Sequence, residues 1–239
     1  MSVFYPYFAY GNYTKPAGRK QDEIKERLCY NYSIFGGCNM ILYLIRHGET
    51  DWNKEGKLQG RTDVPLNDEG KQVAEWTRQA LADVPFDIVY TSPLQRARMT
   101  AEILVGDRKI PIVDDERIIE VGFGLNEGIS KSAWDANMRN FFLKTEDYIP
   151  AQGGETLEEV LERERKFLQE LFENPELEQA TILISTHGAA LSGLLTIIKQ
   201  NPIAKFWAGG LHKNCGLSII EVKKGIPNIL NEAIVLYEV

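Results

Sequence analysis

Apolar runs of strand length alternate with helical patterns along most of this chain, and this alternation sets the narrowest limit on its fold. Ile41-Leu42-Tyr43-Leu44-Ile45 has the length and composition of a buried strand. Thr156-Leu157-Glu158-Glu159 is a capping box, which predicts the start of a long helix. Such alternation is typical of an α/β fold, and we predict a three-layer sandwich in which a mostly parallel sheet carries helices on both faces and a small helical cap insertion. The predicted strands are 41–45, 87–91, 110–113, 181–185, 217–222 and 229–237, and the predicted helices are 67–84, a helix capped by Ser92-Pro93 and running to 104, 131–142, 156–172 and 189–198.

The first 39 residues differ from the rest of the chain. They hold six of the ten tyrosines (positions 5, 7, 10, 13, 30 and 32) and, apart from a short helical pattern at 21–28, no periodic pattern. The codons around Gly36-Gly37 can form a purine-rich ribosome-binding sequence just ahead of Met40. We therefore expect a domain over 40–239, with residues 1–39 either an N-terminal arm without fixed structure or a segment upstream of the true start. An intact mass from the native source that includes residues 1–39 would exclude the second interpretation.

Charge and cysteine content exclude several classes of protein. The net charge is −7, so there is no general attraction to nucleic acid or to anionic membranes, and no apolar run approaches the ~20 residues of a membrane span. Three cysteines without a Cys-x-x-Cys pair do not suggest a disulfide framework or a zinc site. We expect a cytoplasmic protein, with the choice between monomer and homodimer left open. An anionic substrate must then be bound by a local cluster of basic residues.

Two of the three histidines share one sequence context. His47 and His187 are each followed by glycine at the end of an apolar run. Because the carboxyl ends of parallel strands meet at one edge of a sheet, we expect both histidines at that edge, with Arg46 and Arg96 beside them. Arginine presents a planar fork that matches phosphate oxygens, and histidine changes its charge near neutral pH. Gly188 begins a helix whose first amides attract anions. The cluster predicts a phosphate-binding site.

The segments around these residues resemble the histidine phosphatase superfamily, also called the phosphoglycerate mutase-like family. A lone Arg-His-Gly would be a weak signal, but the matching segments occur in the family's order and cover about 40–239. They are Leu44 to Asn53, Gln59 to Asn67, Ser92 to Ala97 with Thr100 to Glu102, Glu120 with Phe123-Gly124 and Glu127-Gly128, Gly153 to Thr156, and Ser185 to Gly188.

The resemblance implies a phosphoric monoester hydrolase that acts on small phosphorylated metabolites through a phosphohistidine. His47 matches the nucleophile, and nearby guanidinium groups would keep it neutral and reactive. Glu120 matches the general acid, which protonates the leaving oxygen and then activates water. The basic side chains supply positive charge for the transferring group, so no metal or other cofactor is expected. The positions expected to contact the phosphoryl group are Arg46, Asn53, Arg96, His187 and Gly188.

Two alternatives to a phosphatase stay open at this point. The first is a phosphoglycerate mutase-type phosphotransferase; the family's mutase members carry a longer insertion after the acid, whereas the segment from Glu120 to Gly153 is short here. The second is a catalytically silent phosphate-binding module, against which the intact set of arginine and histidine positions argues. Among the nearby carboxylates, Glu127 is the alternative to Glu120 as the acid.

The predicted cap, residues 125–152, departs from the family because Asn126 stands where many phosphatase members have tryptophan. Its aromatic residues either meet the non-phosphate part of the substrate or pack the cap onto the core. Elsewhere, we expect Arg61 to be a solvated loop residue or a rim contact, and His212 to be structural. The cap aromatics are Trp134, Phe141, Phe142 and Tyr148.

Overall fold

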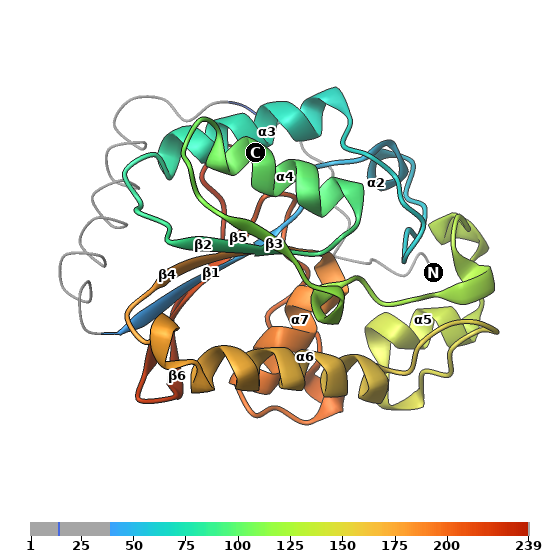
Figure 1. The fold of residues 1–239 in the computed structure, drawn as a ribbon. Helices are drawn as coiled ribbons and strands as arrows, with labels where there is room; N and C mark the ends of the chain where they lie inside the picture. Colours follow the sequence, from blue (N-terminus) through green and yellow to red (C-terminus); the bar gives the residue numbers. More distant parts are fainter. Residues whose placement is uncertain (1–13, 15–38, 239) are drawn as a thin grey trace.

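The computed structural model of this chain describes Thr14 and residues 39–238. One six-stranded sheet lies at the centre, in the order β3-β2-β4-β1-β5-β6, and all of its strands run in one direction except β5, which is antiparallel to both of its neighbours, β1 and β6 (Figure 1). The predicted α/β class and mostly parallel sheet are therefore confirmed. The strands are β1 (Met40–Arg46), β2 (Ile88–Thr91), β3 (Ile112–Asp114), β4 (Thr181–Thr186), β5 (Leu217–Lys223) and β6 (Ile226–Ile234).

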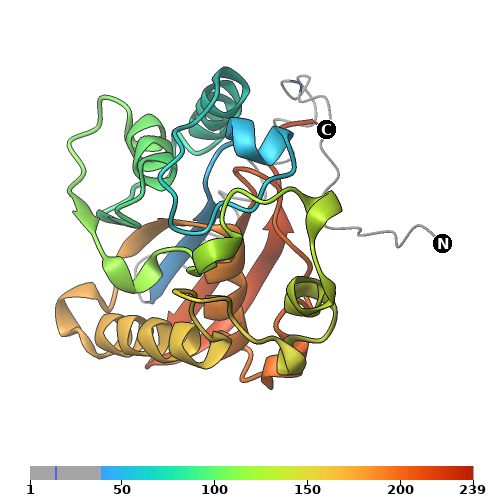
Figure 2. The same cartoon turned by 90° about the vertical axis from the view of Figure 1, so that its right-hand side faces the viewer.

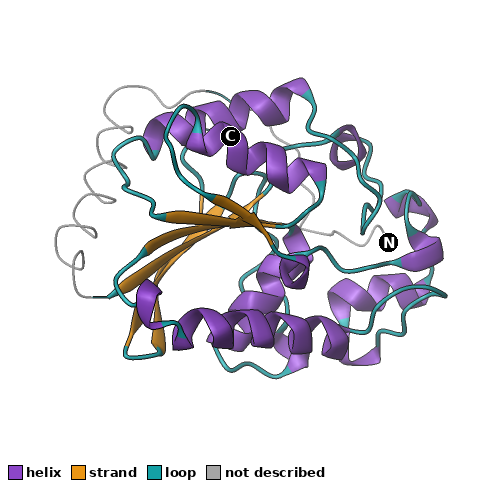
Figure 3. Cartoon of the chain, viewed as in Figure 1, coloured by secondary structure: helices purple, strands orange, loops and turns teal. Residues whose placement is uncertain are grey.

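Helices cover both faces of the sheet (Figures 1 and 3). Helices α3 (Asp68–Ala80) and α4 (Gln95–Val105) lie on one face, and α6 (Leu157–Glu173) and α7 (Gly188–Ile198) on the other. The central strand β1 is buried throughout and contributes to both layers. Its odd-numbered residues, 41 to 45, pack with α3 and α4, and its even-numbered residues, 40 to 44, pack with α6 and α7, as the twofold period of a strand requires.

One predicted boundary is wrong in each of the helices α3 and α4. Helix α3 ends at Ala80 rather than at residue 84, although Val84 is still buried, because the chain turns there toward β2 and Pro85 disfavours helical backbone at the residue before it. Helix α4 begins at Gln95, without a side-chain cap, and not at the Ser92-Pro93 pair. The Ser92 hydroxyl instead lies 2.7 Å from Nε2 of His187 and accepts from the Leu94 amide at 3.3 Å.

The predicted cap, which includes α5 (Ala136–Leu143), lies beyond the carboxyl ends of the strands and is built from short elements (Figures 1 and 2). Helix α5 begins after the N-cap Asp135, five residues later than predicted. The cap packs against the segment around Phe206 and Trp207, which the sequence did not connect with it. No helix of the described part of the chain is both long and apolar enough to cross a membrane. The remaining short elements are α2 (Asp51–Lys54) and the 3-10 turns Glu116–Ile118, Gly124–Asn126, Lys131–Ala133, Thr145–Asp147, Pro175–Leu177 and Ile203–Lys205.

Most of residues 1–39 fall outside the described part of the chain, and so do the helical pattern at 21–28 and both interpretations of this segment. Thr14 is described, and its backbone exchanges hydrogen bonds of 2.9 and 2.8 Å with that of Glu238.

Candidate active site

The parallel pairing of β1 and β4 brings the two histidine segments together. Arg46 is the register partner of Thr186, and the His47 amide donates to the Thr186 carbonyl at 2.9 Å. The rings of His47 and His187 consequently lie side by side, with centroids 5.2 Å apart. Both histidines leave the sheet at the carboxyl ends of their strands, as expected.

His47 is held in one tautomer by its own backbone. Its Nδ1 lies 2.6 Å from the Gly48 carbonyl oxygen, and a carbonyl can only accept, so Nδ1 carries the proton and Nε2 keeps its lone pair. Burial, followed by the charges of Arg96 and Arg46, holds the pKa of His47 well below its usual range. The sequence argument had named only the arginines, whereas burial is the largest cause. The ring is therefore a neutral imidazole with a free Nε2 at neutral pH.

Arg46 offers an unused donor beside this ring. Its Nη1 donates to the His212 carbonyl at 2.6 Å, which fixes the guanidinium. Its Nε is buried and has no hydrogen-bond partner among the described residues. A buried charged donor without a partner is costly, and it becomes favourable only when an anion accepts from it.

Arg96 connects a neighbouring loop to His187. It is fully buried, and Nη1 and Nη2 donate to the carbonyls of Thr62 and Gly60 at 2.9 and 2.6 Å. Burial lowers the pKa of Arg96 to about 10, so the group is still protonated at neutral pH. Its Nε donates to Nδ1 of His187 at 3.1 Å, so the other ring nitrogen of His187 carries the proton and donates to Ser92.

His187 lies behind the cavity wall rather than in it, since the residues that line the cavity do not include it. Burial, and then the positive charge of Arg96, holds the pKa of His187 well below its usual range. Both ring nitrogens are engaged by protein groups. Direct contact with a phosphoryl oxygen requires one of these two hydrogen bonds to be exchanged.

Glu120 lines the cavity and occupies the N-terminus of α7. Its Oε1 accepts from the amides of Val121 and Ala190, both at 3.0 Å, and its Oε2 accepts from Ala189 at 3.3 Å. The sequence predicted that these helix amides attract an anion; in the structure two of them donate to the Glu120 carboxyl. Gly188 also lines the cavity, and a Cβ there would come within 2.6 Å of Leu211 Cδ1.

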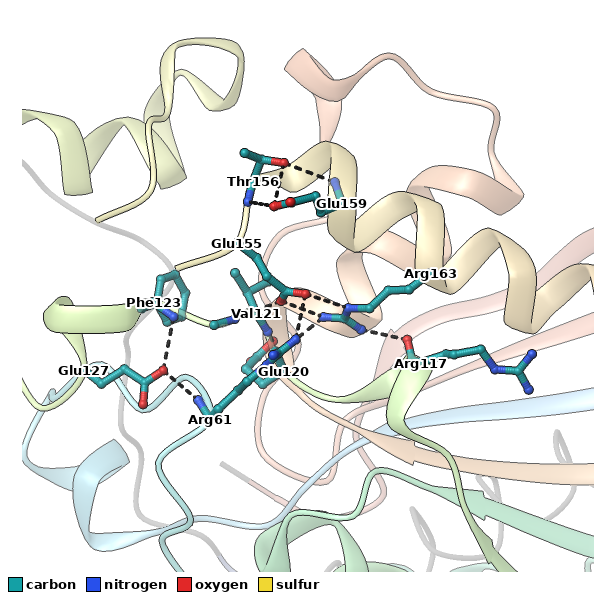
Figure 4. Close-up of polar contacts among 11 residues, drawn as sticks. Arg61, Arg117, Glu120, Val121, Phe123, Glu127, Glu155, Thr156, Glu159 and Arg163 are labelled. Carbon is teal, nitrogen blue, oxygen red and sulfur yellow. Dashed lines mark hydrogen bonds and ion pairs between the residues drawn. The ribbon is translucent and has the colours of Figure 1, made fainter. Parts of the chain in front are cut away.

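Glu127, the alternative acid, makes a different set of contacts. Its carboxylate accepts from the backbone amides of Arg61, Thr62 and Phe123 at 2.9, 2.8 and 3.1 Å, and it does not line the cavity (Figure 4). It therefore ties the loop after Gly60 to the start of the cap. Arg61 is an exposed loop residue, 44% exposed, and its Nη2 also pairs with Glu155 at 2.6 Å.

Asn53 lines the cavity from the short helix α2. Its amide oxygen accepts from the Thr50 amide at 3.2 Å, which closes a capping box. Asn214 donates to this oxygen at 3.3 Å and to the His47 carbonyl at 3.1 Å, and so links the two residues. The sequence argument missed Asn214, which lies in no recognisable motif. The buried His212, expected to be structural, lies 2.7 Å from the Ser218 hydroxyl through its Nε2.

The cavity has a volume of about 500 Å³ and two chemically distinct linings, which we call the phosphate wall and the aromatic wall. In the aromatic wall, the rings of Trp134 and Phe142 stack at 5.1 Å and those of Phe142 and Trp207 at 5.2 Å. Trp207 comes from outside the predicted cap, and the buried Tyr148 does not reach the cavity. The phosphate wall consists of Arg46, His47, Asn53, Arg96 and Gly188, and the aromatic wall of Phe123, Trp134, Phe141, Phe142 and Trp207.

Comparison with known proteins gives consistent results. The family model described as histidine phosphatase superfamily (branch 1) matches residues 42–233. The chain is 38% identical over 155 residues to the uncharacterized phosphatase PhoE of Bacillus subtilis, covering 65% of this chain and 75% of that protein. It is 33% identical over 167 residues to a 2,3-bisphosphoglycerate-dependent phosphoglycerate mutase of Cytophaga hutchinsonii, covering 67% and 78%. The structure of Bacillus stearothermophilus YhfR superimposes with a TM-score of 0.76 at 36% identity, covering 82% of this chain and 97% of that one.

Proposed function

The chain belongs to the histidine phosphatase superfamily (branch 1), and we propose how its cavity hydrolyses small phosphate monoesters. It is a phosphoric monoester hydrolase. One observation carries the assignment of its nucleophile: His47 keeps Nε2 unprotonated because Nδ1 donates to the Gly48 carbonyl, and the unpartnered Nε of Arg46 is buried in the same wall. A neutral imidazole can attack a phosphoryl group, and an unused cationic donor beside it can bind that group's oxygens.

In the proposed first step, Nε2 of His47 attacks phosphorus while the bond to the leaving oxygen breaks, and Glu120 gives that oxygen a proton. The Gly48 carbonyl stabilises the positive charge that develops on the ring. In the second step, Glu120 takes a proton from water, the water oxygen bonds to phosphorus, and the electrons of the phosphorus–nitrogen bond return to His47. Phosphate leaves and the neutral ring is restored.

The remaining predicted site residues support the transferring group. Arg46 and Arg96 place positive charge near His47, as their effect on its pKa indicates. We propose that Asn53 orients the phosphoryl oxygens from the wall and that Gly188 leaves room for them. His187 is proposed to join them by exchanging one hydrogen bond, or to act through Arg96, which it holds at 3.1 Å.

The aromatic wall suggests a neutral, apolar leaving group. Stacked rings gain free energy from apolar surface and nothing from a second anionic group. Beyond Arg46 and Arg96, the described lining offers one cation, Lys57, whose Nζ is paired with Glu55 at 2.5 Å. A mutase has to hold a second phosphate or a carboxylate of its phosphoglycerate. The lining therefore favours the phosphatase over the mutase alternative.

We further propose that residues 40–239 form the catalytic domain, with the cap at about 125–152, and that the enzyme acts in the cytoplasm on small phosphorylated metabolites as a monomer or homodimer. Its net charge of −7 gives no general attraction to nucleic acid or to anionic membrane surfaces, which supports this proposal.

The nucleophile is tested by His47→Ala with p-nitrophenyl phosphate as substrate. The variant should lose at least about 1000-fold in kcat, because the phosphohistidine route is removed. Wild-type activity should survive treatment with a chelator, since the proposed steps use only side chains. Wild-type-like turnover by the variant, or full loss on chelation, would contradict the mechanism.

A further inference from the structure

Two separate sets of contacts fix the carboxyl group and the main chain of Glu120. Its carboxyl is fixed from inside the cavity by the amides of Val121, Ala189 and Ala190. Its main chain is held from outside the cavity by a separate set of charged residues, Arg61, Glu155 and Arg163, which we call the Glu155 clamp (Figure 4). None of the three lines the cavity. The clamp therefore makes no direct contact with a substrate in the cavity.

Glu155 is the centre of the clamp. Its Oε1 pairs with Nη2 of Arg61 at 2.6 Å. Oε1 also accepts a hydrogen bond from Nε of Arg163, and Oε2 accepts one from Nη2 of Arg163, each at 3.2 Å. Glu155 also exchanges two hydrogen bonds with Gly122: its amide donates to the Gly122 carbonyl at 2.8 Å, and its Oε2 accepts from the Gly122 amide at 3.0 Å. Burial alone would raise the pKa of Glu155, but Arg163, the Gly122 amide and Arg61 together hold it below its usual value.

Arg163 extends the clamp to the other side of Glu120. Its Nη1 donates to the Arg117 carbonyl at 2.7 Å, three residues before Glu120, while Gly122 lies two residues after it. Nη2 of Arg163 and Nε of Arg61 also lie 3.4 and 3.5 Å from the Glu120 carbonyl oxygen. The backbone on both sides of Glu120 is thus tied to one partly buried ionic group.

Within the clamp, the Arg163–Glu155 pair is less exposed than a surface ion pair of the same protein, whereas Arg61 is 44% exposed. The side chains of Arg163 and Glu155 are 15% and 17% exposed, whereas those of Arg98 and its partner Glu102 are 35% and 52% exposed. A solvated pair contributes little to stability, but a buried pair with several hydrogen bonds fixes geometry. A proton donor displaced by a fraction of an ångström to about 1 Å loses much of its effect.

We propose that Glu155 and Arg163, with Arg61, are positioning residues for the proton transfers of Glu120. The inference rests on the proposed role of Glu120. The clamp fixes the backbone from Arg117 to Gly122, and this sets the distance from the Glu120 carboxyl to the leaving oxygen and to the attacking water. It contributes to neither binding nor activation of the phosphoryl group.

The way in which the loss of activity depends on the leaving group of the substrate distinguishes this role from a merely structural one. Dinitrophenolate leaves without a proton, so phosphorylation of His47 by 2,4-dinitrophenyl phosphate does not need Glu120. An alkyl leaving group, as in 2-phenylethyl phosphate, needs the proton in that step. Hydrolysis of the phosphohistidine needs Glu120 whichever substrate formed it.

Glu155→Gln and Arg163→Met are therefore expected to keep the burst rate and the kcat/KM for dinitrophenyl phosphate, while its steady-state kcat falls. The kcat/KM for 2-phenylethyl phosphate should fall roughly 10- to 100-fold. Glu120→Gln should give the same pattern with a larger loss. The double variant Glu120→Gln/Glu155→Gln should lose no more than Glu120→Gln alone, because both changes remove one function.

The matched control is Arg98→Met, which removes an ion-paired arginine of the exposed surface and should leave both substrates unaffected. If Glu155→Gln does not fold, Arg163→Lys, which keeps the charge but loses the fork, should give the same pattern. Equal losses on both substrates, or losses that add to those of Glu120→Gln, would overturn the inference. If the wild type gives neither a burst nor a phosphohistidine, the proposed function itself fails and the clamp's role fails with it.

Discussion

The phosphate wall and the aromatic wall belong to one cavity but hold a ligand by opposite means. In the phosphate wall, Arg46 and Arg96 are fixed by hydrogen bonds to backbone carbonyls, and His47 by its bond to Gly48. In the aromatic wall, Trp134 and Phe142 are positioned by stacked rings and apolar packing. The first wall specifies charge and direction, and the second specifies shape and apolar character. Reaction type and choice of leaving group are consequently separable properties of this enzyme.

The two walls also differ in their supports. The phosphate wall stands at the ends of β1 and on α4, which belong to the buried core of the sheet. The aromatic wall is carried by α5 and by short turns of the cap, which pack on the segment around Trp207. A substitution in the aromatic wall should therefore leave the phosphate wall in place. Substitutions in the two walls should differ in size and in dependence on the substrate.

Among the substitutions that compare the two walls, the largest effect is expected from Arg96→Met in the phosphate wall. Removing a cation that stabilises the transferring group should lower kcat/KM by about 100- to 1000-fold for every monoester alike. Kinetics with methyl, 2-phenylethyl and p-nitrophenyl phosphate check this. Arg98→Met on the same helix is the control and should behave as wild type. A loss confined to the aromatic substrates would show that the two walls are not separate.

A smaller and selective effect is expected from Phe142→Leu in the aromatic wall. It should lower kcat/KM about 10-fold for 2-phenylethyl phosphate and leave methyl phosphate nearly unchanged, because only the apolar leaving group contacts the ring. Thermal unfolding of the variant separates this effect from loss of packing. The wild type should also prefer 2-phenylethyl phosphate to 3-phosphoglycerate. The opposite preference would mean that charge, not the aromatic wall, selects the substrate.

The smallest effect concerns the titration of the phosphate wall. Burial and then the arginines lower the pKa of His47, and burial also lowers the pKa of His187 and brings the pKa of His212 to about 4. A lowered pKa keeps the His47 ring neutral as the pH falls through the usual value of 6.5, so the nucleophile is lost only well below that pH. NMR of labelled histidines should therefore find none of the three titrating near 6.5. Arg96→Met should move the pKa of His47 upward, though not fully, since burial persists. An imidazole of His47 that titrates at its usual pKa would contradict this account.

The phosphate wall could be predicted from the sequence, whereas the aromatic wall could be predicted only in part. Arg46, His47 and Arg96 directly follow recognisable strands or lie in ordered motifs, and the sheet then dictates where they meet. Trp207 joins the cap through packing between distant segments, for which a single sequence carries no periodic signal. The start of α4 was predicted wrongly for a related reason, because the Ser92 hydroxyl forms a hydrogen bond with His187 instead of capping the helix.

The contacts that position Glu120 could not be predicted from the sequence either. Glu120 was named from its motif position, but the preference for it over Glu127 had no physical basis until the amides that hold each carboxylate were seen. Arg163 lies on a regular amphipathic helix and looks like any solvated charge. Its contacts with Arg117 and Glu155 depend on how α6 packs beside the chain leading to Glu120. Such contacts follow from tertiary packing rather than from local pattern.

The central claim is that the phosphoryl group passes through Nε2 of His47. The most direct measurement is to quench the enzyme in alkali during turnover of 2,4-dinitrophenyl phosphate and to map the phosphorylated peptide by mass spectrometry. We predict an acid-labile, alkali-stable phosphate on His47, in an amount that matches the burst of dinitrophenolate, and none in His47→Ala. Full turnover without a phosphorylated His47 peptide, or a phosphate on another residue, would contradict the account.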